Sequence, residues 1–377
     1  MANFLKNLFA KDPTSVSGVD IGPSSIKIVQ LKKKKGRAVL ERYGALSLGP
    51  YAGVEIGRAT ALPADKIASA VLDLMREAKI SAKDCGFSIP MSSSLVTIIE
   101  IPEVEEKQLA SIIPIEARKY VPVPISEVLL DWWVIPREGS MPTDEYSETR
   151  PGALYRGSAP KQKTIEVLLV VIHNEAIAKA QDVIKMSGLR ASFYEIEIFS
   201  TIRSALDREG SPVMLFDFGA GSTKLYIVDR GVLRVSHVIN RGSQDLTIAL
   251  SKALNISPEN AESMKRTKGL TAVTEGRDTV TAVSSTLNYI FAETNRVILT
   301  YEKKHLKNLG KILLTGGGAG LKGLLEVAQT SFQTEVVLAN PFGKVESPAF
   351  LEGVLKQVGP EFAVSVGLAL RKLQEIR

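Results

Sequence analysis

Two stretches of similar sequence, one in each half of the chain, constrain its fold more than any other feature. Residues 18–31 read GVDIGPSSIKIVQL, and residues 213–231 read VMLFDFGAGSTKLYIVDRG. Both contain the pattern Asp-x-Gly-x-x-Ser-x-Lys, in which Asp20 matches Asp217. In each stretch an apolar run ends at the aspartate and a second one follows a glycine turn, as in a β-hairpin. Two such hairpins predict a duplicated fold whose halves face one ligand, and chance recurrence of a short pattern is the alternative.

The turn of each hairpin is suited to binding phosphate. Glycine leaves room for backbone N–H groups to point into one concavity, where they can donate hydrogen bonds to phosphate oxygens. Asp20 and Asp217 lie at the mouths of these turns, and a carboxylate there suits a hydrated Mg²⁺ ion. The two hairpins together therefore predict a site for a phosphate chain with Mg²⁺.

The composition is that of a globular protein with more than one domain. The chain has 377 residues, of which 45% are hydrophobic and 23% charged, and its net charge is +6. A single cysteine, Cys85, excludes an internal disulfide and is typical of a reducing compartment. The sequence has no signal-peptide pattern, and its apolar runs are too short to span a bilayer, so we expect a soluble intracellular protein. The basic run at 32–35 is interpreted as a solvated turn rather than a nucleic-acid site.

Two segments are not expected to be part of a packed core, one at the N-terminus and one in the middle of the chain. The first thirteen residues place Phe4, Leu5, Leu8 and Phe9 on one helical face, which suits contact with a membrane surface or a partner. A frayed terminal turn is the simpler interpretation. Residues 136–162 are polar and rich in Gly, Pro, Ser and Arg, so we expect a mobile loop there.

Hydrophobic periodicity predicts an α/β protein of two lobes with an inserted α+β module in the first. Pro114 is expected to kink or end a helix of this module, and Gly367 to be a point of close packing. The expected domains are 1–91 (first lobe), 92–190 (module), 191–210 (return to the first lobe), 211–360 (second lobe) and 361–377 (a helix that packs back on the first lobe). Outside the second hairpin, strands are expected at 16–21, 25–33, 37–48, 85–89, 95–101, 127–135, 163–172, 191–197, 233–239 and 311–315. Helices are expected at 64–78, 104–120, 176–186, 244–254, 258–265, 279–304 and 364–373.

A third element with binding character lies near the C-terminus. Residues 312–326 read ILLTGGGAGLKGLLE, a buried strand followed by a glycine turn and a helix. Bare backbone beside a helix N-terminus permits the close approach of a flat ring or a phosphate, and a plain tight connection is the alternative.

Taken as a set, the two hairpins and the TGGG turn resemble the actin-like ATPase superfamily, which includes actin, FtsA, sugar kinases and heat-shock chaperone ATPases. A closer resemblance is to the PilM family, the actin-like proteins of type IV pilus assembly. It rests on segments that follow the family's order across nearly the whole chain, namely 18–31, 115–132 (IEARKYVPVPISEVLLDW), 194–206 (YEIEIFSTIRSAL), 261–265 (AESMK), 315–324 (TGGGAGLKGL) and 335–346 (EVVLANPFGKVE).

The resemblance implies an ATP site with Mg²⁺. Asp20 and Asp217 would hold the ion through water, and Lys27 would contact phosphate as a point charge, whereas a lysine that faces solvent is the alternative. Glu262 and Lys265 would flank the ribose and base, and an exposed surface pair is the alternative. The implied phosphate contacts are Gly22, Ser24 and Ser25 in the first hairpin and Gly219, Gly221, Ser222 and Thr223 in the second. The implied adenosine turn comprises Gly316, Gly317, Gly318 and Leu321.

The resemblance also implies a position for catalysis. Glu197 matches the family's acid at the end of the strand before the connecting helix, where a polar residue orients the attacking water. The family usually has proline after this acid, whereas this chain has Ile198. A structural carboxylate at a strand end is the alternative, and any hydrolysis is expected to be slow.

The function implied is that of a cytoplasmic component of the pilus machine, held at the inner membrane by the N-terminal cytoplasmic peptide of PilN. Residues near Tyr120, Pro122, Trp132 and Trp133 would border the peptide's groove, and strand alternation places the two tryptophans on opposite faces. Other pilus-assembly and motor components are further implied partners, and self-association stays open. A scaffold that binds ATP without turnover, an FtsA-like filament-forming membrane tether and a sugar or acetate kinase are the alternatives.

Overall fold

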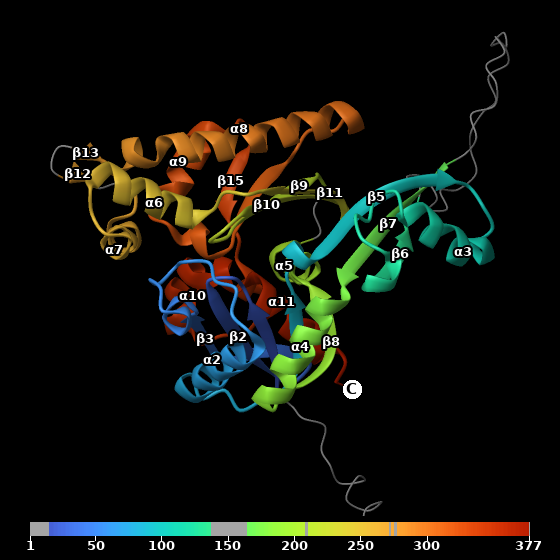
Figure 1. The fold of residues 1–377 in the computed structure, drawn as a ribbon, viewed down its shortest axis with the longest axis horizontal. Coiled ribbons are helices and arrows are strands. Elements are labelled where there is room, and N and C mark those ends of the chain that lie inside the picture. The colour runs from blue at the N-terminus through green and yellow to red at the C-terminus, as the bar shows by residue number, and fades with distance from the viewer. Residues whose placement is uncertain (1–14, 137–163, 208–209, 271–272, 275–276, 377) are drawn as a thin grey trace, which may run out of the picture. The chain divides into compact units, whose positions relative to one another are not determined.

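The computed structural model describes residues 15–136, 164–207, 210–270, 273–274 and 277–376 (Figure 1). The chain divides into two compact units, one formed by Met1–Ser93 with Glu175–Arg377 and the other by Ser94–Asn174. The smaller unit corresponds to the inserted module, but it ends at Asn174 rather than at residue 190. The first thirteen residues and the loop expected at 136–162, apart from Pro136, lie outside the described residues.

The first lobe is built on a five-stranded sheet with the strand order β3-β2-β1-β4-β8. Three strands form an antiparallel meander, and two more continue the sheet in parallel beside β1. The strands are β1 (Ser15–Ile21), β2 (Ser25–Lys34), β3 (Arg37–Ser47), β4 (Asp84–Ile89) and β8 (Arg190–Ile196). β1 and β2 are the first hairpin that the sequence predicts.

The second lobe repeats this plan with the strand order β11-β10-β9-β14-β15. Its antiparallel strands are again followed by two parallel ones, and β14 pairs with β9 as β4 pairs with β1. The strands are β9 (Val213–Phe218), β10 (Thr223–Asp229), β11 (Val232–Ile239), β14 (Lys311–Thr315) and β15 (Glu335–Leu338). The matching topologies confirm the duplicated fold inferred from the two hairpins.

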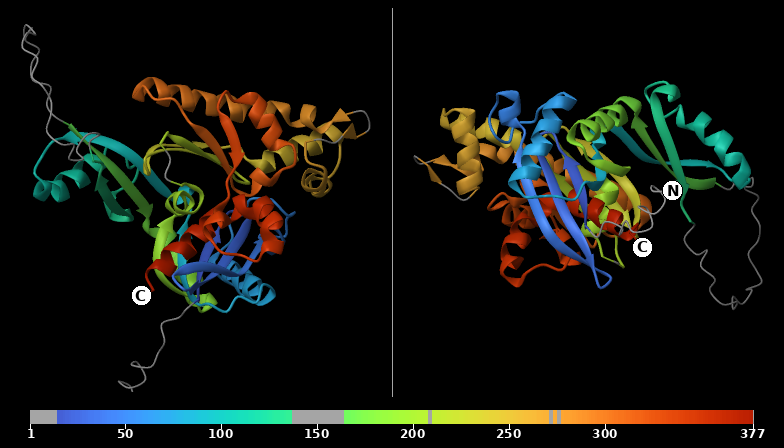
Figure 2. Two further views of the ribbon diagram at one scale, coloured as in Figure 1. Left: turned by 180° about the vertical axis from the view of Figure 1, so that it is seen from behind. Right: turned by 90° about the horizontal axis from the view of Figure 1, so that it is seen from below.

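Helices cover the sheets of both lobes (Figures 1 and 2). In the second lobe, Val283, Leu287, Ile290 and Phe291 of the long helix are buried in one core with Phe216, as their spacing predicts. The helices of this lobe are α6 (Ser243–Leu254), α7 (Pro258–Lys268), α8 (Thr279–His305) and α9 (Leu324–Ser331), and a small strand pair consists of β12 (Val273–Thr274) and β13 (Arg277–Asp278). The other helices of the larger unit are α2 (Ala64–Glu77), α4 (Asn174–Ser187), α5 (Glu197–Ala205), α10 (Glu352–Val358) and α11 (Ala363–Gln374).

The last helix, α11, packs on the first lobe against β1 and α5, as expected for the C-terminal segment. The backbones approach so closely that only glycine fits at two positions. A Cβ added at Gly367 would lie 1.9 Å from the carbonyl oxygen of Ser200, and one at Gly18 would lie 1.9 Å from that of Ser365. Gly367 is therefore the close-packing point that the sequence suggests.

The inserted module consists of a three-stranded antiparallel sheet, ordered β5-β7-β6, with α3 on one face. Pro114 lies inside α3, and the helix ends at Ala117, before the expected end at residue 120. Trp132 packs against the core beneath α3, whereas Trp133 is 49% exposed, which settles which of the two is core. The elements are β5 (Ser94–Pro102), α3 (Glu106–Ala117), β6 (Val128–Val134) and β7 (Thr164–His173), and α4, which the sequence assigns to the module, belongs to the larger unit.

No helix among the described residues is long and apolar enough to span a membrane. Cys85 is a free cysteine buried in β4, and burial raises the pKa of its thiol to about 12. The thiol is therefore protonated at neutral pH and acts as a small core side chain.

Candidate nucleotide-binding cleft

The two hairpin turns have the same hydrogen bond. The N–H of Gly22 donates to the carbonyl of Ser25 over 3.0 Å, and the N–H of Gly219 donates to that of Ser222 over 3.0 Å. Strand register places Asp20 opposite residue 27 and Asp217 opposite residue 224. Each lobe therefore presents an aspartate and a lysine side by side at the base of a glycine turn.

The TGGG turn lies directly against the end of the second hairpin's first strand. β14 runs parallel to β9 and places Thr315 opposite Asp217. Gly316 has φ +84°, and a Cβ there would lie 2.3 Å from Asp217 Oδ1. A Cβ at Gly318 would lie 2.5 Å from Cδ1 of Phe218. Glycine is therefore required at Gly316 and Gly318, where the turn leaves no space for a side chain before it continues as a 3₁₀ helix (Gly317–Gly320).

These elements surround a cavity of about 470 Å³, within the range usual for small-molecule sites. Most of the residues that the sequence singles out line it: Asp20, Gly22, Ser24, Ser25, Lys27, Glu197, Asp217, Gly219, Glu262, Lys265, Gly316, Gly317, Gly318 and Leu321. Gly221, Ser222 and Thr223 are not among the lining residues. The hydroxyl of Thr223 is buried and donates to the carbonyl of Arg241 over 2.8 Å, so it joins the start of β10 to the segment that follows β11.

Acidic and basic groups alternate at the bottom of the cavity. Lys27 Nζ lies 3.8 Å from Asp20 Oδ2. In the second lobe, Lys224 Nζ lies 2.6 Å from Glu197 Oε1 and 3.4 Å from Asp217 Oδ2. Burial lowers the pKa of Lys224, but the two carboxylates outweigh burial and raise this pKa well above its ordinary value. Burial also raises the pKa of Glu197, against the effect of the lysine.

The pair Glu262 and Lys265 is buried, so the alternative of an exposed surface pair is wrong. Glu262 and Lys265 are 4% and 6% exposed, and Lys265 Nζ lies 2.6 Å from Glu262 Oε2. The same oxygen accepts a hydrogen bond from the hydroxyl of Thr247, while Oε1 accepts one from Nε of Arg266 over 2.7 Å. Burial would raise the pKa of Glu262, but these partners lower it. The carboxylate is therefore held ionised in one orientation.

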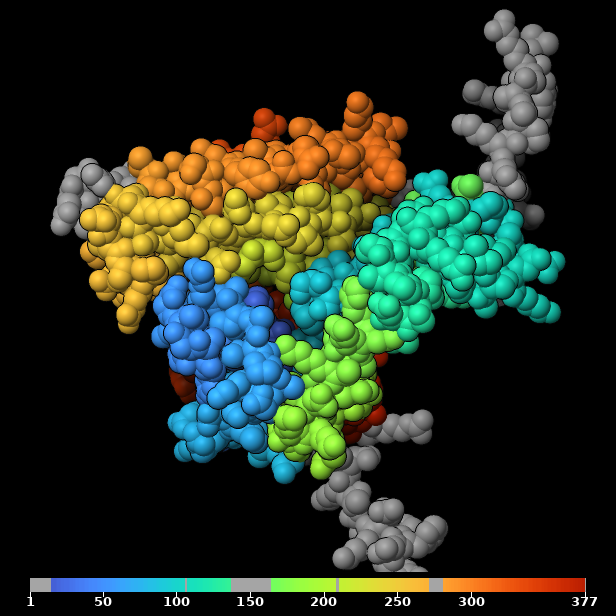
Figure 3. Space-filling view, viewed as in Figure 1, coloured from blue at the N-terminus to red at the C-terminus, as the bar shows by residue number. Residues whose placement is uncertain are grey.

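The first lobe touches the second at this same corner. Gly57 has φ +88°, and a Cβ there would lie 2.3 Å from Glu262 Oε1. Two residues on, the N–H of Ala59 donates to Oε1 of Gln244 over 3.2 Å. In Figure 3 the blue surface of the first lobe meets the yellow surface of the second along this line. The loop after β3 thus closes one end of the cavity, which the sequence does not indicate.

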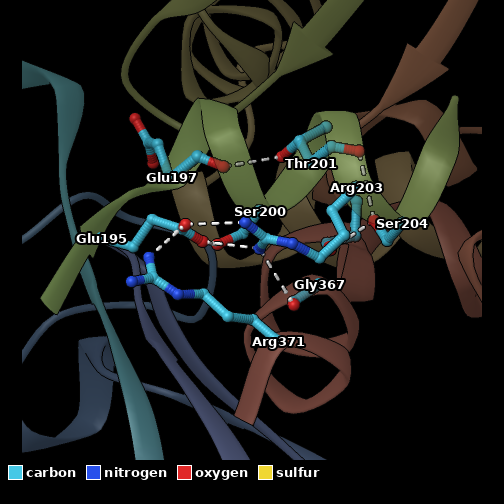
Figure 4. A network of polar contacts seen from close by, with 9 residues as sticks. Glu195, Glu197, Ser200, Thr201, Arg203, Ser204, Gly367 and Arg371 are labelled. Atoms are coloured by element: carbon cyan, nitrogen blue, oxygen red, sulfur yellow. Dashed lines mark hydrogen bonds and ion pairs between the residues drawn. The ribbon is translucent and has the colours of Figure 1, made fainter. Parts of the chain in front are cut away.

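Glu195 and Glu197 lie two residues apart but have different surroundings (Figure 4). Glu195 accepts hydrogen bonds from Arg203 and Ser200 of α5 and from Arg371 of α11, and the carboxylate is the centre of this cluster. Burial would raise the pKa of Glu195, but these donors lower it. Glu197 points away from the cluster, and its backbone carbonyl accepts from the hydroxyl of Thr201 over 3.0 Å. Glu195 therefore fixes the start of α5, and with it the position of Glu197.

Three charged residues of the cavity, Lys224, Arg266 and Glu361, are missing from the expected set. Lys224 aligns with Lys27 in the repeat, so the pattern itself contained the signal. Glu361 comes from the C-terminal segment, where no motif marks it, and it lines the cavity close to the TGGG turn. Burial raises the pKa of Glu361, and the charges of Lys27 and Arg266 oppose the rise.

The residues present fit a nucleotide with Mg²⁺. Among the described residues, the hydroxyl of Thr315 is buried at the cavity wall without a hydrogen-bond partner, as expected of a group that a ligand would satisfy. The glycine turns offer backbone where a Cβ would clash. Asp20 and Asp217 line the cavity with carboxylates, the kind of oxygen ligand that suits Mg²⁺ and its water.

Comparison with known proteins agrees with this architecture. FtsA of Streptococcus pneumoniae (strain D39) is 25% identical over 366 residues, which cover 89% of this chain and 77% of that protein. FtsA of Bacillus subtilis (strain 168) is 27% identical over 168 residues, which cover 39% of this chain and only 38% of that protein.

Among solved structures, the chain is similar to the PilM–PilN type IV pilus biogenesis complex, with a TM-score of 0.76, 22% identity and coverage of 95% of this chain and 98% of that chain. It is also similar to the ethanolamine utilization protein EutJ of Carboxydothermus hydrogenoformans, with a TM-score of 0.54, 16% identity and coverage of 98% and 96%. These likenesses confirm the actin-like ATPase fold. The family model for the type IV pilus assembly protein PilM matches residues 18–147 and 154–373, and the chain therefore belongs to the PilM family.

Proposed function

We propose that this protein is an ATP-binding component of the type IV pilus assembly platform, placed on the cytoplasmic side of the inner membrane by its partner PilN. The observation that carries the proposal is the cavity in which both hairpin turns and the TGGG turn meet. Nucleotide binding in it would link the two lobes, because its walls come from both.

The roles of the cavity residues follow from their chemistry. Asp20 and Asp217 would orient Mg²⁺ through water, and Lys27 would neutralise phosphate charge. At the ribose, Glu262 would accept and Lys265 would donate hydrogen bonds, and Gly316 to Gly318 would admit the adenosine. When bound, the ion would neutralise charge on the phosphates, and Glu197 would face the water that attacks the terminal one.

Titration calorimetry with Mg·ATP tests the site. Replacing Asp217 by Ala removes one of the two carboxylates that orient the ion, and we expect an affinity lower by roughly 10–100-fold. Asp182→Ala changes an exposed aspartate of α4 and should bind like the wild type. Wild-type affinity in Asp217→Ala would refute the assigned site.

The module offers a surface for the N-terminal cytoplasmic peptide of PilN. Leu129 and Trp133 alternate on the face of β6 opposite to the side chains that pack beneath α3, and they are 57% and 49% exposed. Tyr120, in the turn that follows α3, is 45% exposed. Large apolar side chains in this number on a small unit are typical of an interaction site.

Replacement of Trp133 by Ala should weaken binding of a labelled PilN peptide by about 30-fold, because buried tryptophans at interface centres contribute about 2 kcal/mol or more. The measurement is fluorescence anisotropy with the full chain. Phe350→Ala is the matched control, since Phe350 is 82% exposed but lies in the larger unit. Equal affinities of the two variants would place the peptide elsewhere.

A second candidate function is a scaffold that binds nucleotide without hydrolysing it. It is favoured by the ion pair between Lys224 and Glu197, because Glu197 is the carboxylate proposed to position water. Turnover and binding therefore need separate measurement.

A further inference from the structure

Lys224 has only 14% of its side chain exposed, although lysine is among the residues least often buried. Its ammonium group lies between two carboxylates, 2.6 Å from Glu197 Oε1 and 3.4 Å from Asp217 Oδ2. Asp217 is proposed to orient Mg²⁺, and Glu197 is proposed to position the attacking water. A single cation therefore links the two carboxylates on which hydrolysis would depend.

The duplicated hairpin provides an internal comparison. Lys27 occupies the position of Lys224 in the first lobe, yet its ion pair with Asp20 is longer, with 3.8 Å between Nζ and Oδ2. The pattern is shared, but the surroundings of the two lysines are not. Both lysines line the cavity, but Lys27 has an ion pair with one carboxylate and Lys224 has ion pairs with two.

Glu197 is held at one oxygen by two donors. Oε1 of Glu197 forms the ion pair with the ammonium of Lys224 and also accepts a hydrogen bond from the N–H of Met91 over 2.8 Å. In hydrolysis the oxygen of water bonds to the terminal phosphorus, the bond between that phosphorus and the bridging oxygen breaks, and the electron pair leaves with ADP. The proton of the water must pass to an acceptor, and two donors, the Lys224 ammonium and the Met91 N–H, already occupy Oε1 of Glu197.

We propose that Lys224 is a positioning residue that keeps Glu197 away from bound ATP, an inference that rests on the proposed ATP site. As a result, this chain would bind the nucleotide but hydrolyse it only slowly. The lysine binds Glu197 tightly and keeps it at the cavity wall. ATP binding itself depends on the glycine turns, Lys27 and the two aspartates, and it does not need Glu197 to be free.

The test compares variants of the full chain at saturating Mg·ATP, with phosphate release as the first readout. Lys224→Ser leaves space for water beside Glu197, and we expect turnover to rise on the order of 100-fold, the usual contribution of a positioned acid or base. The double variant Lys224→Ser/Glu197→Gln should lose this gain, and Lys224→Arg should return turnover toward the wild-type value. Lys252→Ser, at an exposed position of α6, is the control for loss of a lysine.

The second readout is the affinity for a non-hydrolysable ATP analogue with Mg²⁺. We expect Lys224→Ser to bind it within about tenfold of the wild type, which would show that the lysine acts on chemistry and not on binding. Loss of analogue binding in this variant, or binding with no gain in turnover, overturns the role of Lys224 and leaves the nucleotide site intact. A wild-type chain that binds no analogue refutes the nucleotide site itself. If Lys224→Ser does not fold, Lys224→Gln, which keeps the length of the side chain without its charge, gives the same comparison.

Discussion

Replacement of Gly316 by Ala should abolish measurable binding of Mg·ATP. Gly316 has φ +84° and ψ +167°, a region that only glycine adopts readily and that costs other residues about 1–3 kcal/mol. The added Cβ would also lie 2.3 Å from Asp217 Oδ1 and 2.8 Å from the carbonyl oxygen of Phe218. Either the turn or the aspartate must move, and both lie in the proposed site. Titration calorimetry measures the loss, and thermal unfolding measures the accompanying strain.

Gly320→Ala is the matched control, because Gly320 lies in the same turn and lines the same cavity. A Cβ there meets nothing within 4 Å. This variant should bind Mg·ATP like the wild type. If the two alanine variants bind equally, the close approach of the turn to Asp217 is irrelevant to the ligand.

Replacement of Gly367 by Ala should destabilise the protein more than an ordinary core substitution. The Cβ would lie 1.9 Å from the carbonyl oxygen of Ser200 and 2.5 Å from its carbonyl carbon, so α11 and α5 must separate. Overpacking of a tight core costs about 1–3 kcal/mol, and a clash between backbones belongs at the upper end of this range. Urea unfolding followed by circular dichroism should show a lower midpoint.

Gly353→Ala tests whether the effect is specific to this contact. Gly353 lies in α10 with nothing within 4 Å of a Cβ, and alanine is favoured over glycine in a helix by about 0.5–1 kcal/mol. Its unfolding midpoint should stay the same or rise. A midpoint for Gly367→Ala that matches this control would contradict the close packing of α11.

The parts of the fold that the sequence predicts are those with a local signal. The hairpins are marked by alternation and glycine, and the long helix α8 by its apolar periodicity, so their bounds agree closely with the structure. The end of the module is different. The apolar face of α4 looks the same whether the helix packs on the module or on the larger unit, because periodicity shows that a face is buried but not against what.

The residues of the candidate site also differ in whether a local sequence pattern predicts them. Asp20, Asp217 and the TGGG turn lie in recognisable patterns, and the structure brings them to one cavity. Glu361 enters this cavity from the last segment of the chain, and no local pattern indicates such a contact. Thr223 shows the opposite case, since its place in the motif suggests a ligand contact but its hydroxyl satisfies the carbonyl of Arg241.

The C-terminal segment joins the two lobes independently of the chain connection before β9. The N–H of Gly316, in the second lobe's turn, donates to the carbonyl of Pro360 over 2.9 Å. Two residues later Phe362 is buried among first-lobe side chains such as Val29, and α11 continues from there. The same short segment thus contacts the glycine turn at one end and continues at the other into a helix packed against β1 and α5. The wall of the cavity and the C-terminal helix of the first lobe are therefore parts of one continuous piece of chain.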